Sequence, residues 1–231
     1  MSGRVLVVTA HPDDVDFGAA GTVAKWVRDG WDVRYVVVTR GQKGAWDAHM
    51  DVEEYGALRE AEQRAAAKAV GVDDVTFLDW MDSEVFDSLE LRLALSREFR
   101  RHQPHRLLTM IPEPLPTDRF VNHPDHRAVG QATLDITMTG GTTASIFPEL
   151  LDEGLEPWRE CRETWLMGPA IKPTPVDVTD TLDAKIAAIH CHTSQIGDRD
   201  VETAIRQRLR DAGRQFGIPY AETFRVISYR R

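Results

Sequence analysis

Short runs of apolar, mostly β-branched residues alternate along the chain with longer segments in which apolar residues recur at helical spacing. The short runs predict strands at residues 4–9, 32–39, 75–78 and 106–110. The longer segments predict helices at 18–28, 57–70, 88–101 and 124–138, and Gly30 and Gly71 follow two of them as stop signals. This alternation predicts an α/β fold with a mostly parallel, Rossmann-like sheet that carries helices on both faces.

The pattern becomes weaker after Gly140 and Gly141. It still predicts strands at 163–167 and 223–227 and helices at 181–192 and 201–216, with a proline-containing loop at 169–175. We expect a single domain over residues 1–231, in which residues 1–140 form the core βα units. Residues 141–231 are expected to complete the pocket as a small C-terminal cap region.

Composition and charge disfavour several classes of partner. The formal net charge is −9 and no basic stripe interrupts it, so neither nucleic acid nor an anionic membrane surface is an expected partner. The longest apolar runs are far too short to cross a bilayer, and the N-terminal residues leave no room for a signal peptide. We therefore expect a cytoplasmic protein with no integral membrane segment and a small-molecule substrate. Assembly into a homo-oligomer stays open.

Two similar polar clusters each follow a predicted strand. His-Pro-Asp-Asp at residues 11–14 comes directly after the first strand, and Asn-His-Pro-Asp-His at 122–126 comes after the fourth strand and begins a helix. The carboxyl ends of parallel strands lie along one edge of an open sheet, which is where ligands bind in such folds. We therefore expect the fold to bring the two clusters together although they are far apart in sequence.

The residue types in these clusters suit a divalent metal site. Histidine nitrogens and carboxylate oxygens are the usual non-thiol ligands of zinc, and a catalytic site needs three ligands with one position left for water. His11 and Asp14 can bind from the first loop, and His123 or His126 can complete the set, because spacing alone does not choose between them. Asp13 and the remaining histidine would then supply a base for water and a group that stabilises the oxyanion. Taken singly, each aspartate could instead be a helix N-cap.

The clusters belong to longer motifs. The run Val-Thr-Ala-His-Pro-Asp-Asp-Val-Asp-Phe-Gly-Ala-Ala-Gly at residues 8–21 resembles the signature of the GlcNAc-phosphatidylinositol de-N-acetylase family, also called PIG-L or LmbE. The run Asn-His-Pro-Asp-His-Arg-Ala at 122–128 resembles its second motif, and weaker similarities occur at 39–44, 59–62 and 192–195. The similarities follow the family's order over nearly the whole chain, and the two main motifs are highly specific in combination.

The resemblance implies a zinc-dependent N-deacetylase whose Zn²⁺ ligands are His11, Asp14 and His126. It implies that Asp13 is the general base and that His123 is the electrophile and proton donor. Asp16 would be a buried carboxylate that supports the site, and we expect Asp125 to support it in the same way. Histidine and carboxylate ligands also accept other divalent transition metals.

Substrate contacts are predicted at Arg40, Arg59, Asp82 and His192. Arg59 could instead pair with Glu62 on a solvated helix face. Asp82 follows the third strand, where relatives use an acidic residue to bind sugar hydroxyls, and His192 should close over the pocket together with residues 193–195. Some relatives carry a tyrosine before the second motif that helps with the oxyanion, whereas Phe and Val stand at positions 120 and 121 of this chain. Gln and Lys at 42 and 43 also replace acidic residues of some thiol-pathway relatives.

The favoured function is metal-dependent hydrolysis of an N-acyl group, usually acetyl, on an N-acetylglucosamine-like sugar or glycoconjugate. One alternative is an amidase that uses the same site on a larger amide, such as a thiol conjugate. Another is a metal-binding regulatory protein without catalysis, but such a protein would need neither Asp13 nor His123. Dinucleotide binding is disfavoured because the first loop lacks Gly-x-Gly-x-x-Gly and carries two carboxylates.

Overall fold

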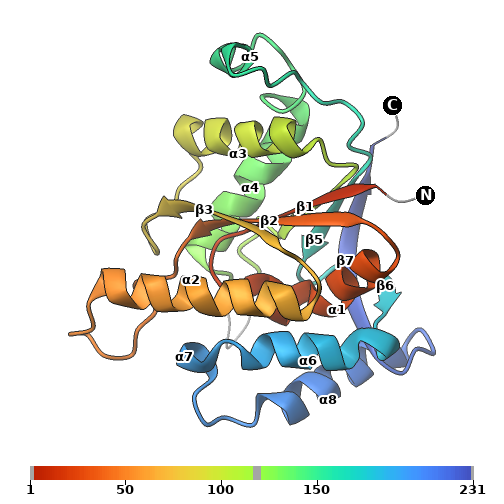
Figure 1. Ribbon diagram of the computed structural model, residues 1–231. Coiled ribbons are helices and arrows are strands. Elements are labelled where there is room, and N and C mark those ends of the chain that lie inside the picture. Colours follow the sequence, from red (N-terminus) through yellow and green to blue (C-terminus); the bar gives the residue numbers. More distant parts are fainter. Residues whose placement is uncertain (1–2, 117–120, 230–231) are drawn as a thin grey trace.

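A central sheet organises the computed structural model of the chain, which describes residues 3–116 and 121–229. Its strand order is β3-β2-β1-β4-β5-β7-β6 (Figure 1). Strands β1 to β5 pair in parallel, and β7 runs antiparallel to both β5 and β6. The strands are β1 Arg4–Thr9, β2 Asp32–Thr39, β3 Asp74–Trp80, β4 Arg106–Met110, β5 Glu163–Met167, β6 Thr174–Asp177 and β7 Ala221–Ser228. The predicted mostly parallel α/β sheet is confirmed.

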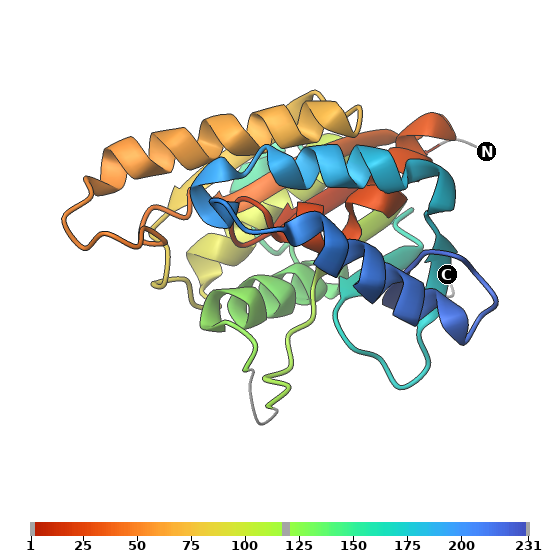
Figure 2. The ribbon, with the colours of Figure 1, turned by 90° about the horizontal axis from the view of Figure 1, so that it is seen from below.

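Helices cover both faces of this sheet (Figures 1 and 2). One face carries α3 (Leu89–His102) and α4 (Pro124–Met138), and the other carries α1 (Asp14–Arg28), α2 (Val52–Ala69) and α6 (Leu182–His190). Alternate residues of β1 divide between the two cores, because successive side chains of a strand point to opposite faces. The remaining helices are α5 Glu149–Asp152, the 3-10 turn η1 Thr179–Thr181, α7 Thr193–Ile196 and α8 Val201–Arg214, and α8 packs on α6.

Several element boundaries differ from the prediction. Helix α1 begins at Asp14 rather than at residue 18, and α2 begins at Val52 rather than at residue 57. Asp51 causes the early start of α2, since its side chain accepts hydrogen bonds from the backbone N–H groups of Glu53 and Glu54. The helix predicted at 181–192 corresponds to α6, which ends two residues earlier at His190, and a short helix that was not predicted, α7, begins at Thr193.

The C-terminal part extends the sheet as well as covering it. It supplies β5, β6 and β7 to the sheet, and its helices α6, α7 and α8 lie against the core units. Strand β6 begins in the last two residues of the segment predicted as a loop, and it includes Pro175. Proline cannot donate a ladder hydrogen bond, but an edge strand such as β6 tolerates it. None of the helices among residues 3–116 and 121–229 is long and apolar enough to cross a membrane.

Candidate metal centre and active site

Three loops that follow parallel strands meet around His11. This residue follows β1, Asp82 follows β3, and Asp125 lies in the first turn of α4 after β4. The Nε2 atom of His11 lies 3.1 Å from Oδ2 of Asp125 and 3.3 Å from Oδ1 of Asp82. All three side chains are buried. The expected convergence of the two polar clusters at one edge of the sheet is therefore present.

Two imidazole nitrogens and the carboxylate of Asp14 lie close together at this edge. Nδ1 of His11 is 3.2 Å from Nε2 of His126, and 3.6 Å from Oδ2 of Asp14. Nε2 of His126 is 3.0 Å from Oδ1 of Asp14. Two nitrogen or oxygen ligands at ordinary zinc distances in a tetrahedral site stand roughly 3.3 Å apart. These residues therefore form a His/His/Asp group whose spacing fits one cation.

His11 also belongs to two other groups that could hold a metal ion, one with His123 and His126 and one with Asp82 and Asp125, and the ligand atoms of each lie within 4.8 Å of one another. The carboxylate of Asp125 can only accept a hydrogen bond, so Nε2 of His11 donates to it, and Nδ1, which faces His126, is the nitrogen that a cation could use. Asp125 is itself fixed by the backbone N–H of Ser83, 2.7 Å from its Oδ2. We therefore take His11, Asp14 and His126 as the candidate metal site, with Asp125 orienting His11 through its Nε2.

The carboxylates and imidazoles of this centre influence each other's pKa values. Burial by itself lowers the pKa of His11, but hydrogen bonds to Asp125, Asp14 and Asp82 outweigh it and raise that pKa well above 6.5. Burial by itself raises the pKa of Asp14, but His126 and His11 outweigh it and hold that pKa well below 3.8. Asp14 is therefore ionised at neutral pH, which is the state that a cation ligand requires.

Asp13 has an unusual backbone conformation beside the ligands. Its φ of 84° lies in the left-handed region, which non-glycine residues rarely occupy. Its backbone N–H donates to Oε1 of Gln63 at 2.7 Å, and its Oδ2 lies 3.0 Å from Nη2 of Arg59. Burial raises the pKa of the Asp13 carboxyl to about 6, although the charges of Arg59, His192 and His11 oppose this and that of Asp14 adds to it. The surrounding residues thus keep a carboxylate with raised basicity beside Asp14.

His123 stands at the N-cap of α4 and is more exposed than the three ligands. Its Nδ1 accepts a hydrogen bond from the backbone N–H of Asp125 at 3.2 Å. Burial lowers the pKa of His123, and His11 and His126 lower it further while Asp125 and Asp82 oppose them. A neutral ring whose Nδ1 is an acceptor carries its proton on Nε2. His123 can therefore donate a hydrogen bond to a ligand while it is uncharged.

A polar cavity of about 400 Å³ opens beside the centre. Besides the residues of the centre it is lined by Lys43, Gly44, Arg59, Asp82, Ser83 and Gln195. The carboxyl of Asp82 has a pKa of about 2, because contacts with His11 and Ser83 outweigh the effect of burial, which raises it. Of the predicted substrate contacts, Arg59 and Asp82 thus reach this cavity.

Arg59 is almost completely buried and serves the first loop. Its Nη2 donates to the carbonyl oxygen of Pro12 at 2.7 Å, and its Nη1 donates to that of Gly41 at 3.0 Å. A side chain at position 41 would collide with this guanidinium, and the φ of 63° there also favours glycine. The alternative pairing of Arg59 with Glu62 is wrong, since Glu62 instead accepts hydrogen bonds from Thr193 and Ser194.

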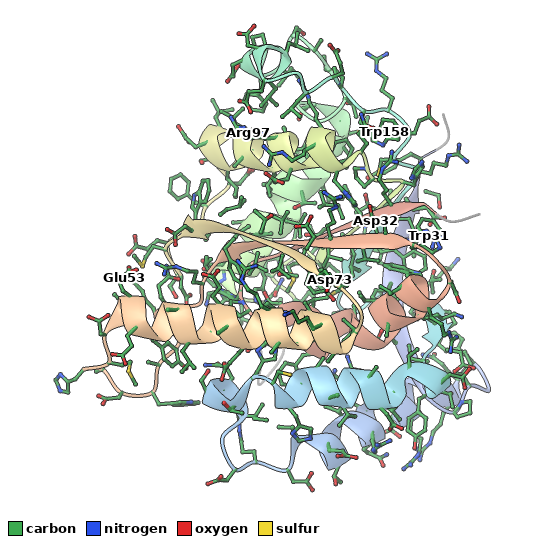
Figure 3. The ribbon with its side chains drawn as sticks, viewed as in Figure 1. Trp31, Asp32, Glu53, Asp73, Arg97 and Trp158 are labelled. Carbon is green, nitrogen blue, oxygen red and sulfur yellow. The ribbon has the colours of Figure 1, made fainter. Side chains whose placement is uncertain are left out.

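Two other predicted substrate contacts lie elsewhere. Arg40 forms ion pairs with Asp79 and with Glu53, which stands near the N-terminal end of α2 (Figure 3). His192 is fully buried, and its Nε2 lies 2.8 Å from Oδ2 of Asp16. Neither Arg40 nor His192 is among the described residues that line the cavities at the centre. His192 lies in the short connection between α6 and α7, and its side chain is buried in the core instead of facing either cavity.

A buried polar network under the first loop escaped the sequence analysis. Nε2 of Gln63 donates to Oδ2 of Asp16 at 2.8 Å, so Gln63 links Asp13 to the Asp16–His192 pair. Lys185, also fully buried, donates to the carbonyl oxygen of Asp16 and pairs with Glu222 at 2.8 Å. Gln63 lies one helical turn after Arg59 and therefore on the same face of α2, and this spacing could have predicted its place near the site. The predicted burial of Asp16 is confirmed. Position 120, before the second motif, lies outside the residues that the structure describes.

The fold and the centre define a class of protein, namely an α/β protein with a candidate metal centre at the carboxyl edge of a parallel sheet. The chain belongs to the PIG-L family, because residues 6–137 match the family model described as GlcNAc-PI de-N-acetylase. The family suggested by the two His-Pro-Asp motifs is thereby confirmed.

Relatives of known name cover most of the chain. It is 29% identical to the diacetylchitobiose deacetylase of Thermococcus kodakarensis, over 97% of this chain and 83% of the relative. It is 30% identical to the 1D-myo-inositol 2-acetamido-2-deoxy-alpha-D-glucopyranoside deacetylase of Mycobacterium sp. (strain JLS), over 84% of this chain and 74% of the relative. The solved structure of N,N'-diacetylchitobiose deacetylase from Pyrococcus horikoshii matches with a TM-score of 0.88 and 31% identity, over 97% of this chain and 84% of that one.

Proposed function

We propose that this protein hydrolyses the N-acetyl amide of an N-acetylglucosamine-like sugar or glycoconjugate, with a divalent cation, zinc by preference, held by His11, Asp14 and His126. One observation carries the proposal: two imidazole nitrogens and the carboxylate of Asp14 lie within 3.0–3.6 Å of one another beside a polar cavity that Asp13 and His123 also line. The deacetylase relatives support the same reaction class. We further propose that residues 1–231 act as one domain in the cytoplasm.

The cation would supply Lewis-acid activation of the water and of the amide carbonyl. Asp13 takes the proton of the attacking water as the new C–O bond forms. With a pKa of about 6, this carboxyl is ionised at neutral pH and yet more basic than an ordinary aspartate, as a general base requires. Arg59 and Gln63 hold the carboxylate and its backbone in place, so the base needs little reorganisation.

His123 stabilises the carbonyl oxygen as negative charge develops on it. Its Nε2–H is the free donor, because Nδ1 is occupied by the backbone N–H of Asp125. A neutral imidazole would become an imidazolate if it gave up that proton. We therefore assign protonation of the leaving amine to Asp13, which returns the water proton as the C–N bond breaks. This assignment moves the proton-donor role, which the family resemblance gave to His123, to the carboxyl.

Arg59 and Asp82 provide the polar surface for the sugar. Asp82 can accept hydrogen bonds from sugar hydroxyls, because contacts with His11 keep its carboxyl ionised. Arg40 and His192 have no place in this part of the proposal.

The test is a substrate panel with the purified, zinc-loaded protein. N-acetylglucosamine, diacetylchitobiose and acylated cysteine conjugates are incubated separately, and the free amine is measured. We expect release from the N-acetyl sugars, loss of release after chelation, and recovery when zinc is added back. Preference for the cysteine conjugates would favour the thiol-conjugate amidase, and release from none of them would favour the non-catalytic metal-binding protein.

A further inference from the structure

A second cavity, of about 580 Å³, begins at the candidate metal centre and extends toward α8. It shares Asp13, Asp14 and His126 with the polar cavity, so the centre lies where the two cavities meet. Its other walls are largely hydrocarbon. They include Phe17, Met110, Ile111, Leu115, Met167 and Leu209. We call this cavity the apolar chamber.

The larger polar side chains in the walls of the apolar chamber already have partners within the protein. Asn122 donates to the carbonyl oxygens of Ile111 and Glu113. Glu222 accepts hydrogen bonds from two backbone N–H groups of α1 and pairs with Lys185. Arg208 donates to the carbonyl oxygen of Phe17. A ligand in the apolar chamber would therefore meet an apolar surface with few polar groups left to bind it.

The two cavities separate the parts of an N-acyl amino sugar. Arg59, Asp82 and His123 line only the polar cavity, which suits the sugar hydroxyls, the nitrogen and the carbonyl oxygen. The third substituent of the carbonyl carbon is the acyl chain, and it points away from the amine-bearing sugar. We infer that the apolar chamber receives this chain, and that the substrate class includes amino sugars with fatty acyl groups longer than acetyl. This inference rests on the proposed function.

The size of the apolar chamber supports a longer chain. A methyl group is similar in size to a water molecule, whose share of liquid volume is about 30 Å³. An acetyl methyl would thus occupy a small part of a chamber of about 580 Å³. Ligand pockets of this kind are typically about 300–1,000 Å³ and mainly apolar. Each methylene that leaves water for such a surface should raise kcat/KM about fourfold until the space is filled.

An acyl series tests the inference with the full chain and its metal. N-acetyl-, N-butanoyl-, N-hexanoyl- and N-octanoylglucosamine are compared by the rate of glucosamine release. We expect kcat/KM to rise from acetyl to hexanoyl by at least about tenfold. Cleavage of the acetyl compound with slower cleavage of every longer one would overturn the inference and leave the proposed function intact. Cleavage of none of these amides would contradict the proposed function itself.

A matched pair of variants on α8 locates the effect. Ala212 lines the apolar chamber, whereas Ala204 is exposed on the same helix. Ala212→Phe, or the smaller Ala212→Leu if the first variant folds poorly, should lower the hexanoyl-to-acetyl ratio of kcat/KM about tenfold. Ala204→Phe should leave this ratio unchanged. An equal ratio in the Ala212 and Ala204 variants would place the acyl chain elsewhere.

The apolar chamber could also receive an apolar group attached to the sugar through oxygen. Octyl N-acetylglucosaminide distinguishes this case, because its acyl group is only acetyl. A gain for the octyl glycoside without a gain along the acyl series would overturn the inference. A gain along the acyl series, abolished by Ala212→Phe, would support it.

Discussion

The two parts of the sheet contribute to the site in different ways. The part from β1 to α4 carries the candidate ligands, Asp13 and His123, all in loops or first helical turns at the carboxyl edge. The part from β5 to β7 supplies Lys185, His192 and Glu222, all of them buried. These side chains contact residues of α1 over long sequence separations. The first part thus holds the reactive groups, and the second fixes the backbone that presents them.

This difference explains why the reactive groups can be recognised in the sequence and the supporting residues cannot. Reactive groups must point into the same small volume, and two short motifs at strand ends are enough to do this. The buried side chains that hold these loops in place need only the right length and a partner for hydrogen bonding, so no short motif marks them. Variants of the two parts should therefore fail in different ways, the first in turnover and the second in stability.

The largest effect is expected in the first part, for Asp13→Asn. Loss of the general base should lower kcat about 10²–10⁴-fold, while zinc content and thermal stability stay near those of the wild type. Asp73→Asn, at an exposed position before β3 (Figure 3), is the control and should change neither. Near-normal turnover by Asp13→Asn would remove this residue from the mechanism. Steady-state kinetics and metal analysis measure both quantities.

In the second part, Lys185→Met should destabilise the fold. It leaves the carboxylate of Glu222 buried without its cation, which typically costs about 3–5 kcal/mol. The double variant Lys185→Met/Glu222→Gln should recover part of this free energy of unfolding, because the remaining buried group is neutral. Arg206→Met removes a more exposed cation from α8 and should lower the free energy of unfolding much less than Lys185→Met does. Urea unfolding measures all three, and equal losses in Lys185→Met and Arg206→Met would contradict the account.

Most of the fold was predictable because its elements are regular. β1, β2, β4, β5 and α4 have the predicted bounds, since β-branched runs and helix stop signals are local. Strand β6 was missed because a proline-rich segment is typical of a loop, and only the free edge of β7 makes it a strand. Helix α7 was missed because its four residues are too few to show a helical pattern.

The residues of the candidate site also divide into those that local sequence predicts and those that it does not. His11, Asp13, Asp14, His123 and His126 could be predicted because motif and strand end coincide, although their chemical roles stay proposals. Arg40 and His192 were misplaced because residue type does not reveal direction. Arg40 follows β2 but turns to Glu53 and Asp79, and His192 turns to Asp16.

The smallest of these effects is expected for Gln63→Leu. In the wild type, the side chain of Gln63 links Asp13 of the first part to the Asp16–His192 pair, which the second part supports. This variant removes the acceptor of the Asp13 N–H and the donor to Asp16, so the left-handed Asp13 loses its support. We expect kcat to fall about 10–100-fold with little change in KM, as for other partners that orient a site. Gln131→Leu, at an exposed position of α4, is the matched control. A change confined to KM would indicate a substrate contact instead.

Titration of Zn²⁺ into chelator-stripped protein tests the central claim most directly, because it distinguishes the two histidines of the second motif. The wild type should bind one equivalent. His126→Ala should lose more affinity than the roughly 10–100-fold that removal of an outer contact costs, whereas His123→Ala should stay within about tenfold of the wild type. Equal losses in both variants, or wild-type affinity in His126→Ala, would contradict a cation site made by His11, Asp14 and His126.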